Sequence, residues 1–374
     1  MNSERAHWLA WSQIEGIGPI LLKRLHQHFG SLSTAWQAAT PDLLAVEGIG
    51  LTLGATLDQQ RQAIDPDKKL AAFEARHANF WTPADVAYPP LLFEIADPPP
   101  LLFYKGQTEL LNAIQTMPSV AIVGTRSPST YGQRWTCRIT QQLVAHDVIV
   151  VSGLAAGIDR WAHQQAIEND GLTIAVLGTG VDQTYPWSNR ALQAKISRQG
   201  LLLSEYPNGT PADKAHFPRR NRIIAGLSRV VVVTEAPARS GALITARLAN
   251  DYGRDVFALP GSLDNSCSQG CLNLINQGAQ MILDESTLIR ALRQLPQLDL
   301  PVVAPTAQPA QVPVENLSPT MQQVLAQVSS DPIKLDQLVQ QLPLSTGEIL
   351  STLMELELSG AVTQLPGMRY QRCL

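Results

Sequence analysis

The seven residues HFPRRNR, 216–222, hold the densest set of possible anion ligands in this 374-residue chain. They place Arg219, Arg220 and Arg222 beside Asn221 and the ring of Phe217. Guanidinium groups grip phosphates through paired hydrogen bonds, and an aromatic ring gives a base a flat face to stack on. The segment stands where a loop turns into a helix, so helix N-terminal amides add donors. A solvated charge cluster on a helix is the alternative, and the rest of the chain decides between the two.

Seven apolar runs alternate with amphipathic helical patterns through the middle of the chain. The runs are 119–123, 148–151, 173–177, 201–204, 229–233, 255–259 and 279–283. Continuous runs of Val, Ile and Leu separated by helices are typical of a parallel sheet covered on both faces. The sequence therefore predicts an α/β fold, a Rossmann-like doubly wound parallel sheet over residues 116–295.

The loops that follow these strands combine glycine with hydroxyl or basic side chains. Such residues are Gly124, Thr125 and Arg126 after the first strand, Ser152, Gly153 and Gly157 after the second, Gly178, Thr179 and Gly180 after the third, with Tyr185 and Pro186 beyond them, and Ser240 and Gly241 after the fifth. Ligands of open parallel sheets bind beyond the carboxyl ends of the strands. Glycine lets the backbone approach, hydroxyls donate to oxygen, and the following helix presents its positive end. The pattern predicts a phosphate-binding edge that includes residues 216–222.

The phosphate is expected to belong to a polymer rather than to a nucleotide cofactor. The first loop reads GTRSPS, which is not the G-x-G-x-x-G of a dinucleotide site, and no P-loop motif occurs. Several arginines on separate loops fit spaced phosphates better than one mononucleotide. We therefore expect no cofactor.

Catalytic and metal sites have little support. Ser152, Asp159 and His163 could form a hydrolytic constellation, but Asp159 reads more simply as a first-turn carboxylate favoured by the helix dipole, and His163 as a packed or solvated histidine. Cys267 and Cys271 have a spacing that a metal could use, yet no Cys/His pair completes the set, so free thiols are the expectation. We expect neither catalytic nor metal-binding residues.

Charge is unevenly distributed. The net charge is −4, but residues 126–255 hold 15 Lys and Arg against 10 Asp and Glu. A basic centre between acidic flanks suits a confined polyanion site. The chain has no apolar run of membrane-spanning length and no apparent signal peptide. Four cysteines fit a reducing compartment, so a cytoplasmic location is expected.

Flanking segments predict further domains. Residues 1–66 contain two echoes of a Gly-Ile-Gly turn followed by a helix, which resemble paired helix-hairpin-helix motifs. Lys23 and Arg24 follow the first turn, so both DNA contact and a purely structural role stay open. Residues 67–115 are a proline-rich connection in which long regular elements are forbidden. Residues 296–316 are a proline-rich linker.

Residues 317–374 read as three helices and a two-stranded wing, a winged helix. From Glu315 onward, three basic residues stand against six acidic ones, and the helix expected in a DNA groove has three glutamates. Phosphates would repel it. We therefore expect a protein-contact or regulatory module rather than a reader of duplex DNA.

Motifs between about Tyr88 and Ala279 match one known family in order and spacing. They include VAIVGTRSPSTYG, VSGLAAGIDRWAHQQAI, GTGVDQTYPWSNRAL, HFPRRNRIIAGL and EAPARSGALITARLA. On these motifs the chain strongly resembles the DprA/Smf family of bacterial DNA-processing proteins.

That resemblance implies a binding protein and not an enzyme. Family members hold single-stranded DNA in a basic pocket of the Rossmann-like domain, dimerise, and load the RecA recombinase onto incoming strands during natural transformation. The implied partners are therefore single-stranded DNA, RecA and a second copy of the chain, with no membrane. The implied DNA-binding residues are Gly124, Thr125, Arg126, Ser152, Gly153, Gly157, Phe217, Arg219, Arg220, Asn221, Arg222, Ser240, Gly241 and Thr245.

Two other functions stay open. Rossmann-like phosphoribohydrolases share the coarse architecture, but the loop APARSGALITA lacks the carboxylate of their P-G-G-x-G-T-x-x-E signature. A transcription factor led by the winged helix is a weaker option, because the expected reading face is acidic.

Overall fold

The computed structural model describes residues 2–76, 79–110, 117–294, 318–329, 331–358, 361–365 and 367–372. Contacts divide the chain into two compact units, Met1–Val302 and Val303–Leu374. Their boundary falls inside the predicted linker 296–316, which itself lies outside the described residues. Over the described ranges, no helix combines the length and the apolar character that a membrane crossing needs.

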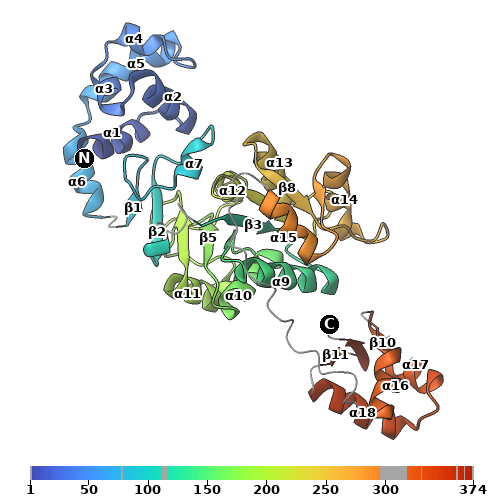
Figure 1. The fold of residues 1–374 in the computed structure, drawn as a ribbon. Coiled ribbons are helices and arrows are strands. Elements are labelled where there is room, and N and C mark those ends of the chain that lie inside the picture. The colour runs from blue at the N-terminus through green and yellow to red at the C-terminus, as the bar shows by residue number, and fades with distance from the viewer. Residues whose placement is uncertain are drawn as a thin grey trace. The chain divides into compact units, whose positions relative to one another are not determined.

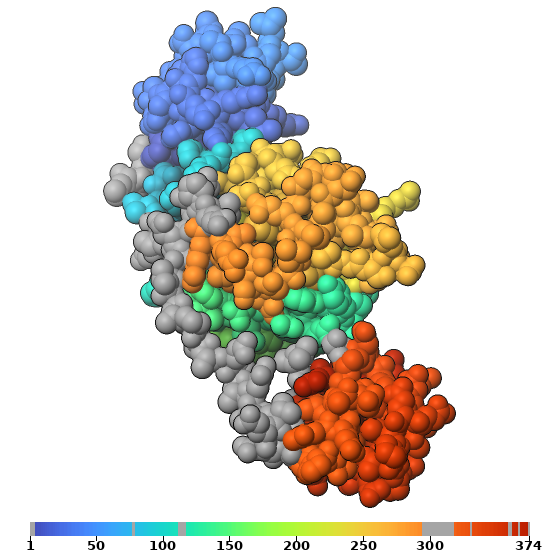
Figure 2. Space-filling view, turned by 45° about the vertical axis from the view of Figure 1, so that its right-hand side comes forward, coloured from blue at the N-terminus to red at the C-terminus, as the bar shows by residue number. Residues whose placement is uncertain are grey.

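The N-terminal helices of the first unit form a small bundle, the blue lobe of Figure 2. They are α1 (Asn2–Ser12), α2 (Pro19–Phe29), α3 (Leu32–Gln37), α4 (Thr40–Leu44), α5 (Leu51–Gln62) and α6 (Pro66–Glu74). The turns before α2 and α5 carry Gly16 and Gly48 at φ of 87° and 96°, which L side chains rarely adopt. A Cβ on Gly16 would lie 2.8 Å from Leu53, and one on Gly48 would lie 2.8 Å from Leu21. The two repeated motifs therefore pack crosswise on each other.

Basic residues after the first turn have partners inside the protein. The Lys23 ammonium donates to the carbonyls of Glu94 and Ile95 at 2.8 and 2.7 Å. Arg24 forms an ion pair with Glu47 at 3.2 Å. This geometry favours the structural role for the N-terminal helices over the DNA-contact role.

Nine strands form the sheet of the first unit, in the order β1-β2-β6-β5-β4-β3-β7-β8-β9 (Figure 1). They are β1 (Phe80–Trp81), β2 (Leu102–Gly106), β3 (Ser119–Val123), β4 (Ile149–Ser152), β5 (Thr173–Leu177), β6 (Leu201–Ser204), β7 (Val230–Val233), β8 (Asp255–Ala258) and β9 (Gln280–Met281). Strands β3 to β9 are parallel to one another, as the apolar runs predict. Strands β2 and β1 add an antiparallel edge beside β6. The parallel sheet is confirmed, and its antiparallel extension is a feature that the sequence did not reveal.

Helices cover both faces of this sheet. One face packs against α7 (Pro90–Glu94), α12 (His216–Gly226), α13 (Gly241–Asp251) and α14 (Gln269–Asn276). The other packs against α9 (Thr130–Val144), α10 (Ile158–Glu168), α11 (Arg190–Gln199) and α15 (Glu285–Gln294). Two 3-10 turns, η1 (Trp187–Asn189) and η2 (Ser266–Ser268), precede α11 and α14. The chain order reverses between β3 and β7, so the doubly wound topology has a switch point there.

The second unit contains three helices and a small sheet in its described residues. Its elements are α16 (Pro319–Gln327), β10 (Ile333–Lys334), α17 (Leu335–Gln341), α18 (Thr346–Leu358), β11 (Val362–Leu365) and β12 (Arg369–Arg372). The sheet order is β10-β12-β11, so the predicted two-stranded wing gains a short third strand. A core around Leu338, Ile349 and Leu353 joins the helices.

Candidate nucleic-acid interface

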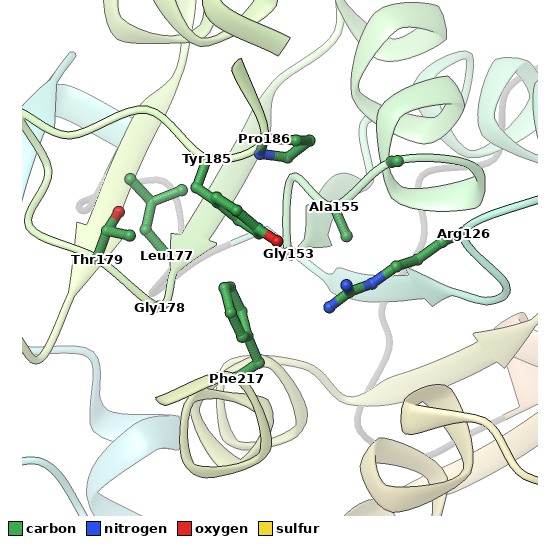
Figure 3. Close-up of a pocket in the computed structure, with 10 residues that line it drawn as sticks. Arg126, Gly153, Ala155, Leu177, Gly178, Thr179, Tyr185, Pro186 and Phe217 are labelled. Carbon is green, nitrogen blue, oxygen red and sulfur yellow. The ribbon is translucent and has the colours of Figure 1, made fainter. Parts of the chain in front are cut away.

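A pocket of about 200 Å³ opens where β4 and β5 end and α12 begins (Figure 3). It is lined by Arg126, Gly153, Ala155, Ala156, Leu177, Gly178, Thr179, Tyr185, Pro186 and Phe217. The lining thus comes from three consecutive strand-end loops and from the first turn of α12. This is the edge of the sheet at which the sequence places phosphate binding.

Two aromatic rings and one cation dominate the pocket. Figure 3 shows Phe217 and Tyr185 pointing toward each other, with Arg126 reaching in from the loop after β3. The ring centroids are 5.2 Å apart with a 36° tilt, and the Arg126 guanidinium carbon lies 5.5 Å from the centre of the Phe217 ring. A Cβ on Gly178 would lie 2.9 Å from Phe217, so glycine lets the ring lie against the end of β5. The site therefore offers flat apolar faces beside an exposed positive charge.

Exposed cations stand on the loops after β3, β6 and β7 and near the start of α12. Arg126, Lys214, Arg219 and Arg239 are all exposed. Neither Arg126 nor Arg219 takes part in an ion pair with another residue that the structure describes. Their guanidinium groups are open to anions from solvent.

Arg220 has a different environment from its neighbour. It is 4% exposed and donates to the carbonyl of Gly153 at 2.6 Å and to that of Val176. Burial lowers its pKa to about 10, against the opposing effect of the Asp159 carboxylate. A Cβ on Gly153 would lie 2.5 Å from the guanidinium nitrogens, which explains the glycine. Arg220 thus clamps the loop after β4 to the end of β5 from below the pocket.

Arg222 and Asn221 also point inward. Arg222 is 7% exposed and forms ion pairs with Asp97 at 3.2 Å and Glu205 at 2.6 Å. Asn221 donates to the carbonyl of Gly241 at 3.2 Å. A helix turns by about 100° per residue, so four consecutive polar side chains cannot share one face. The structure therefore leaves Arg219 outside and assigns its three successors to internal contacts, unlike the row of open forks that the sequence suggests.

The glycines and hydroxyls of the first two loops shape the backbone. Ser152 is fully buried and donates to the carbonyl of Ile122 at 2.6 Å. The Thr125 amide donates to the Glu235 carbonyl at 2.7 Å. Gly157 has φ of 79°, and a Cβ there would lie 2.3 Å from the Thr125 carbonyl oxygen. A Cβ on Gly124 would be as crowded, at 2.7 Å from the Glu235 carbonyl. Of the predicted glycines and hydroxyl residues in these two loops, only Gly153 lines the pocket.

The predicted residues of the loop after β7 divide in the same way. Ser240 caps α13 by accepting from the amide of Ala242 at 3.3 Å. Gly241 is exposed with open space around its Cα. Thr245 is 1% exposed and lies in the helix interior. Gly241 is therefore the accessible member of this predicted group.

Asp159 and His163 are structural here. Asp159 is 6% exposed and accepts from the amides of Gly153 and Ala155. Burial raises the pKa of its carboxyl, and Arg220 opposes that effect. The Thr173 hydroxyl donates to the Val150 carbonyl, so it accepts from His163 Nδ1 at 2.7 Å. Burial lowers the pKa of His163 to about 3. Neither side chain lines the pocket.

Two of the described thiols are made less reactive by burial. Burial raises the pKa of Cys271 to about 12 and that of Cys137 to about 11. In the described ranges, no three His, Cys, Asp or Glu side chains cluster so that they could hold a metal ion.

The predicted set missed part of the pocket wall. Tyr185 and Pro186 line the pocket from the loop after β5, together with Gly178 and Thr179 at the end of that strand. The loop composition places this segment at the phosphate-binding edge, but none of its residues is in the predicted DNA-binding set.

Comparison with known proteins identifies the family. Residues 79–293 match the family model described as DNA recombination-mediator protein A, and residues 308–368 match the DprA winged helix domain. The Smf protein of Synechocystis sp. is 46% identical, over 99% of both chains. DprA of Streptococcus pneumoniae has a solved structure with TM-score 0.64 and 38% identity, over 78% of this chain and 97% of that one.

A second solved relative is DNA processing protein A of Helicobacter pylori, which is described by its single-stranded DNA binding mode. It has TM-score 0.52 and 33% identity, over 57% of this chain and 95% of that one. The two family models together cover most of the sequence, and the Synechocystis relative matches nearly all of it. The chain therefore belongs to the DprA/Smf family of DNA-processing proteins.

Proposed function

We propose that this chain binds single-stranded DNA without sequence preference and catalyses no reaction on it. The observation that carries the proposal is the grouping of the Phe217 and Tyr185 rings with the Arg126 guanidinium in one pocket. Stacking faces beside a cation are what proteins use to hold unpaired bases and their phosphates. The Helicobacter pylori relative, described as binding single-stranded DNA, supports the same ligand.

Pocket size and chemistry support a single flat group rather than a large cofactor. Pockets that enclose drug-sized ligands have about 300–1,000 Å³, whereas this one has about 200 Å³. The lining residues include no carboxylate that could act as a general acid or base. One base can enter while its phosphates stay outside, near Arg126 and Arg219.

Oligonucleotide binding tests this function directly. Labelled oligo(dT) should bind the native chain, and Phe217→Ala should weaken binding by roughly 5- to 100-fold, the cost of one lost stacking contact. Arg126→Ala should weaken binding to every sequence alike. Unchanged affinity in both variants would remove the pocket as the DNA site. Release of free base from AMP by the native chain would instead point to a phosphoribohydrolase.

The wider role that we propose is protection of incoming DNA and loading of RecA during natural transformation, by a homodimer in the cytoplasm. Family membership supports these proposals. Nuclease protection of a bound oligonucleotide, light scattering for the dimer, and RecA filament assembly on strands coated with single-strand-binding protein test the three parts separately. A monomer that binds DNA would contradict the dimer alone.

A further inference from the structure

Beside the pocket stands an exposed tryptophan that the proposed site does not yet use. Trp187 is 69% exposed and Tyr185 is 44% exposed. In the described ranges, these two are the aromatic residues among the exposed large apolar side chains. It follows Pro186, which lines the pocket, so its Cα lies about 3.8 Å beyond that of a lining residue. Burying such a ring would be favourable, and yet the chain holds it in solvent.

The turn that carries Trp187 is pinned to the wall of the pocket. Asn189, which is 1% exposed, donates through Nδ2 to the carbonyls of Leu154 and Ala155 at 2.9 and 3.1 Å. The backbone N–H of Asn189 also donates to the carbonyl of Pro186 at 3.0 Å. Since Ala155 lines the pocket, these bonds fix the distance between the turn and the pocket. Trp187 is therefore presented from a fixed position and not from a swinging loop.

A cation accompanies the ring. The Arg190 guanidinium carbon lies 4.8 Å from the centre of the Trp187 ring, and Arg190 is itself exposed. Stacked arginine and tryptophan leave the second face of the indole open to a flat ligand, with a positive charge at hand for a phosphate. The same pairing of flat face and guanidinium occurs inside the pocket, at Phe217 and Arg126.

We propose that Trp187 and Arg190 form a second stacking platform, which holds the nucleotide next to the one in the pocket. This inference rests on the proposed function and extends its site from one base to a path along the β5 loop. The occupant is a base of the same strand, because the platform adjoins the pocket wall and carries the positive charge that a phosphodiester needs.

The test is a length series of labelled thymidine nucleotides, from a single nucleotide to roughly 16 nucleotides, the upper site size of other single-strand-binding folds. Trp187→Ala should bind strands of two or more nucleotides about 5- to 100-fold more weakly than the native chain, and the single nucleotide equally well. Trp187→Phe should restore most of the loss. Val86→Ala, which truncates an 81% exposed side chain with no role in the site, is the control.

A long strand made largely abasic separates stacking from phosphate contact. On it, Trp187→Ala and the native chain should bind equally, while Arg190→Gln should still weaken binding. Equal affinity of native and Trp187→Ala on all normal strands would overturn the platform while leaving the pocket intact. Failure of both Phe217→Ala and Arg126→Ala to weaken binding to any strand would instead remove the pocket as the DNA site, so the two failures are distinguishable.

Discussion

At the scale of single residues, neighbouring arginines on α12 have opposite tasks. Arg219 is exposed, whereas Arg220 donates to the carbonyl of Gly153, in the loop after β4, and to that of Val176, in β5. A residue that touches the ligand and one that holds its site should differ in what else a substitution changes.

Arg126→Ala and Arg220→Ala test that difference. Both should weaken oligo(dT) binding, the first through a lost phosphate contact and the second because the loops after β4 and β5 separate. Only Arg220→Ala should also lower the melting temperature, since it leaves the buried Asp159 carboxylate without its cation. Calorimetry beside anisotropy decides; an unchanged melting temperature for Arg220→Ala would contradict the clamp.

His163 should make stability depend on pH. Burial lowers its pKa from 6.5 to about 3 in the folded chain, so the unfolded chain binds the proton first as pH falls. Its contribution is fully present above about pH 6.5 and is lost between that value and about pH 3. Urea unfolding at about pH 7.5 and pH 5 should show a smaller loss for His163→Gln than for the native chain. Equal losses would show that His163 has no part in it.

At the scale of elements, α7 connects the N-terminal bundle to α12. Its C-terminal carbonyls accept from Lys23 of α2 on one side. On the other side Asp97, just past α7, pairs with Arg222 of α12, and Glu94 pairs with Arg254 at 2.8 Å. The proline-rich stretch around α7 thus connects α2 of the N-terminal bundle to α12 of the sheet domain.

Removing Arg222 should break the connection between α12 and Asp97. Arg222→Ala leaves Glu205, which is 15% exposed, and Asp97 facing each other without a cation. Loss of one partner of a buried pair costs about 3–5 kcal/mol, so the free energy of unfolding should fall by about that amount in urea titrations. Glu94→Gln is the milder control, because its side chain is half exposed. A loss below about 1 kcal/mol in Arg222→Ala would show that solvent takes over the role of the pair.

Helix α18 gives the second prediction at this scale. Glu348, Glu355 and Glu357 are exposed along it, together with Met354 at 67%. Phosphates repel such a face. A fragment of residues 317–374 should therefore show no tight binding to duplex DNA at physiological salt in a gel shift. Tight binding would restore the duplex-reading role.

What the sequence predicted follows from periodicity. Apolar runs placed β3 to β9 within a residue or two, because strands buried on both faces leave a strong signal. The sequence did not reveal β1 and β2, since β1 has only two residues at the sheet edge and three successive prolines, 98–100, stand just before β2. Loop composition located the pocket but not the inward rotation of Arg220 and Arg222, because side-chain direction depends on packing against β5 and Asp97, distant in sequence.

At the scale of the whole molecule, the distribution of charge matters more than its sum. The net charge is −4, yet exposed Arg126, Lys214, Arg219 and Arg239 share the loops around the strand ends. Local fields, not net charge, set the attraction of a polyanion.

Salt should therefore weaken binding steeply. If these four cations each neutralise one phosphate, the logarithm of affinity should fall with the logarithm of salt at a slope of about −3, and Arg126→Ala should reduce that slope by about 0.7. Titrating single- and double-stranded oligonucleotides side by side measures both. A slope near zero would mean that stacking alone holds the strand.

The crosswise packing of the N-terminal repeats has a consequence for how that bundle folds. Leu21 of one repeat covers Gly48 of the other, and Leu53 covers Gly16 in return. Each repeat thus supplies a leucine that packs against the glycine turn of the other repeat. We therefore expect the bundle to fold only when both repeats are present.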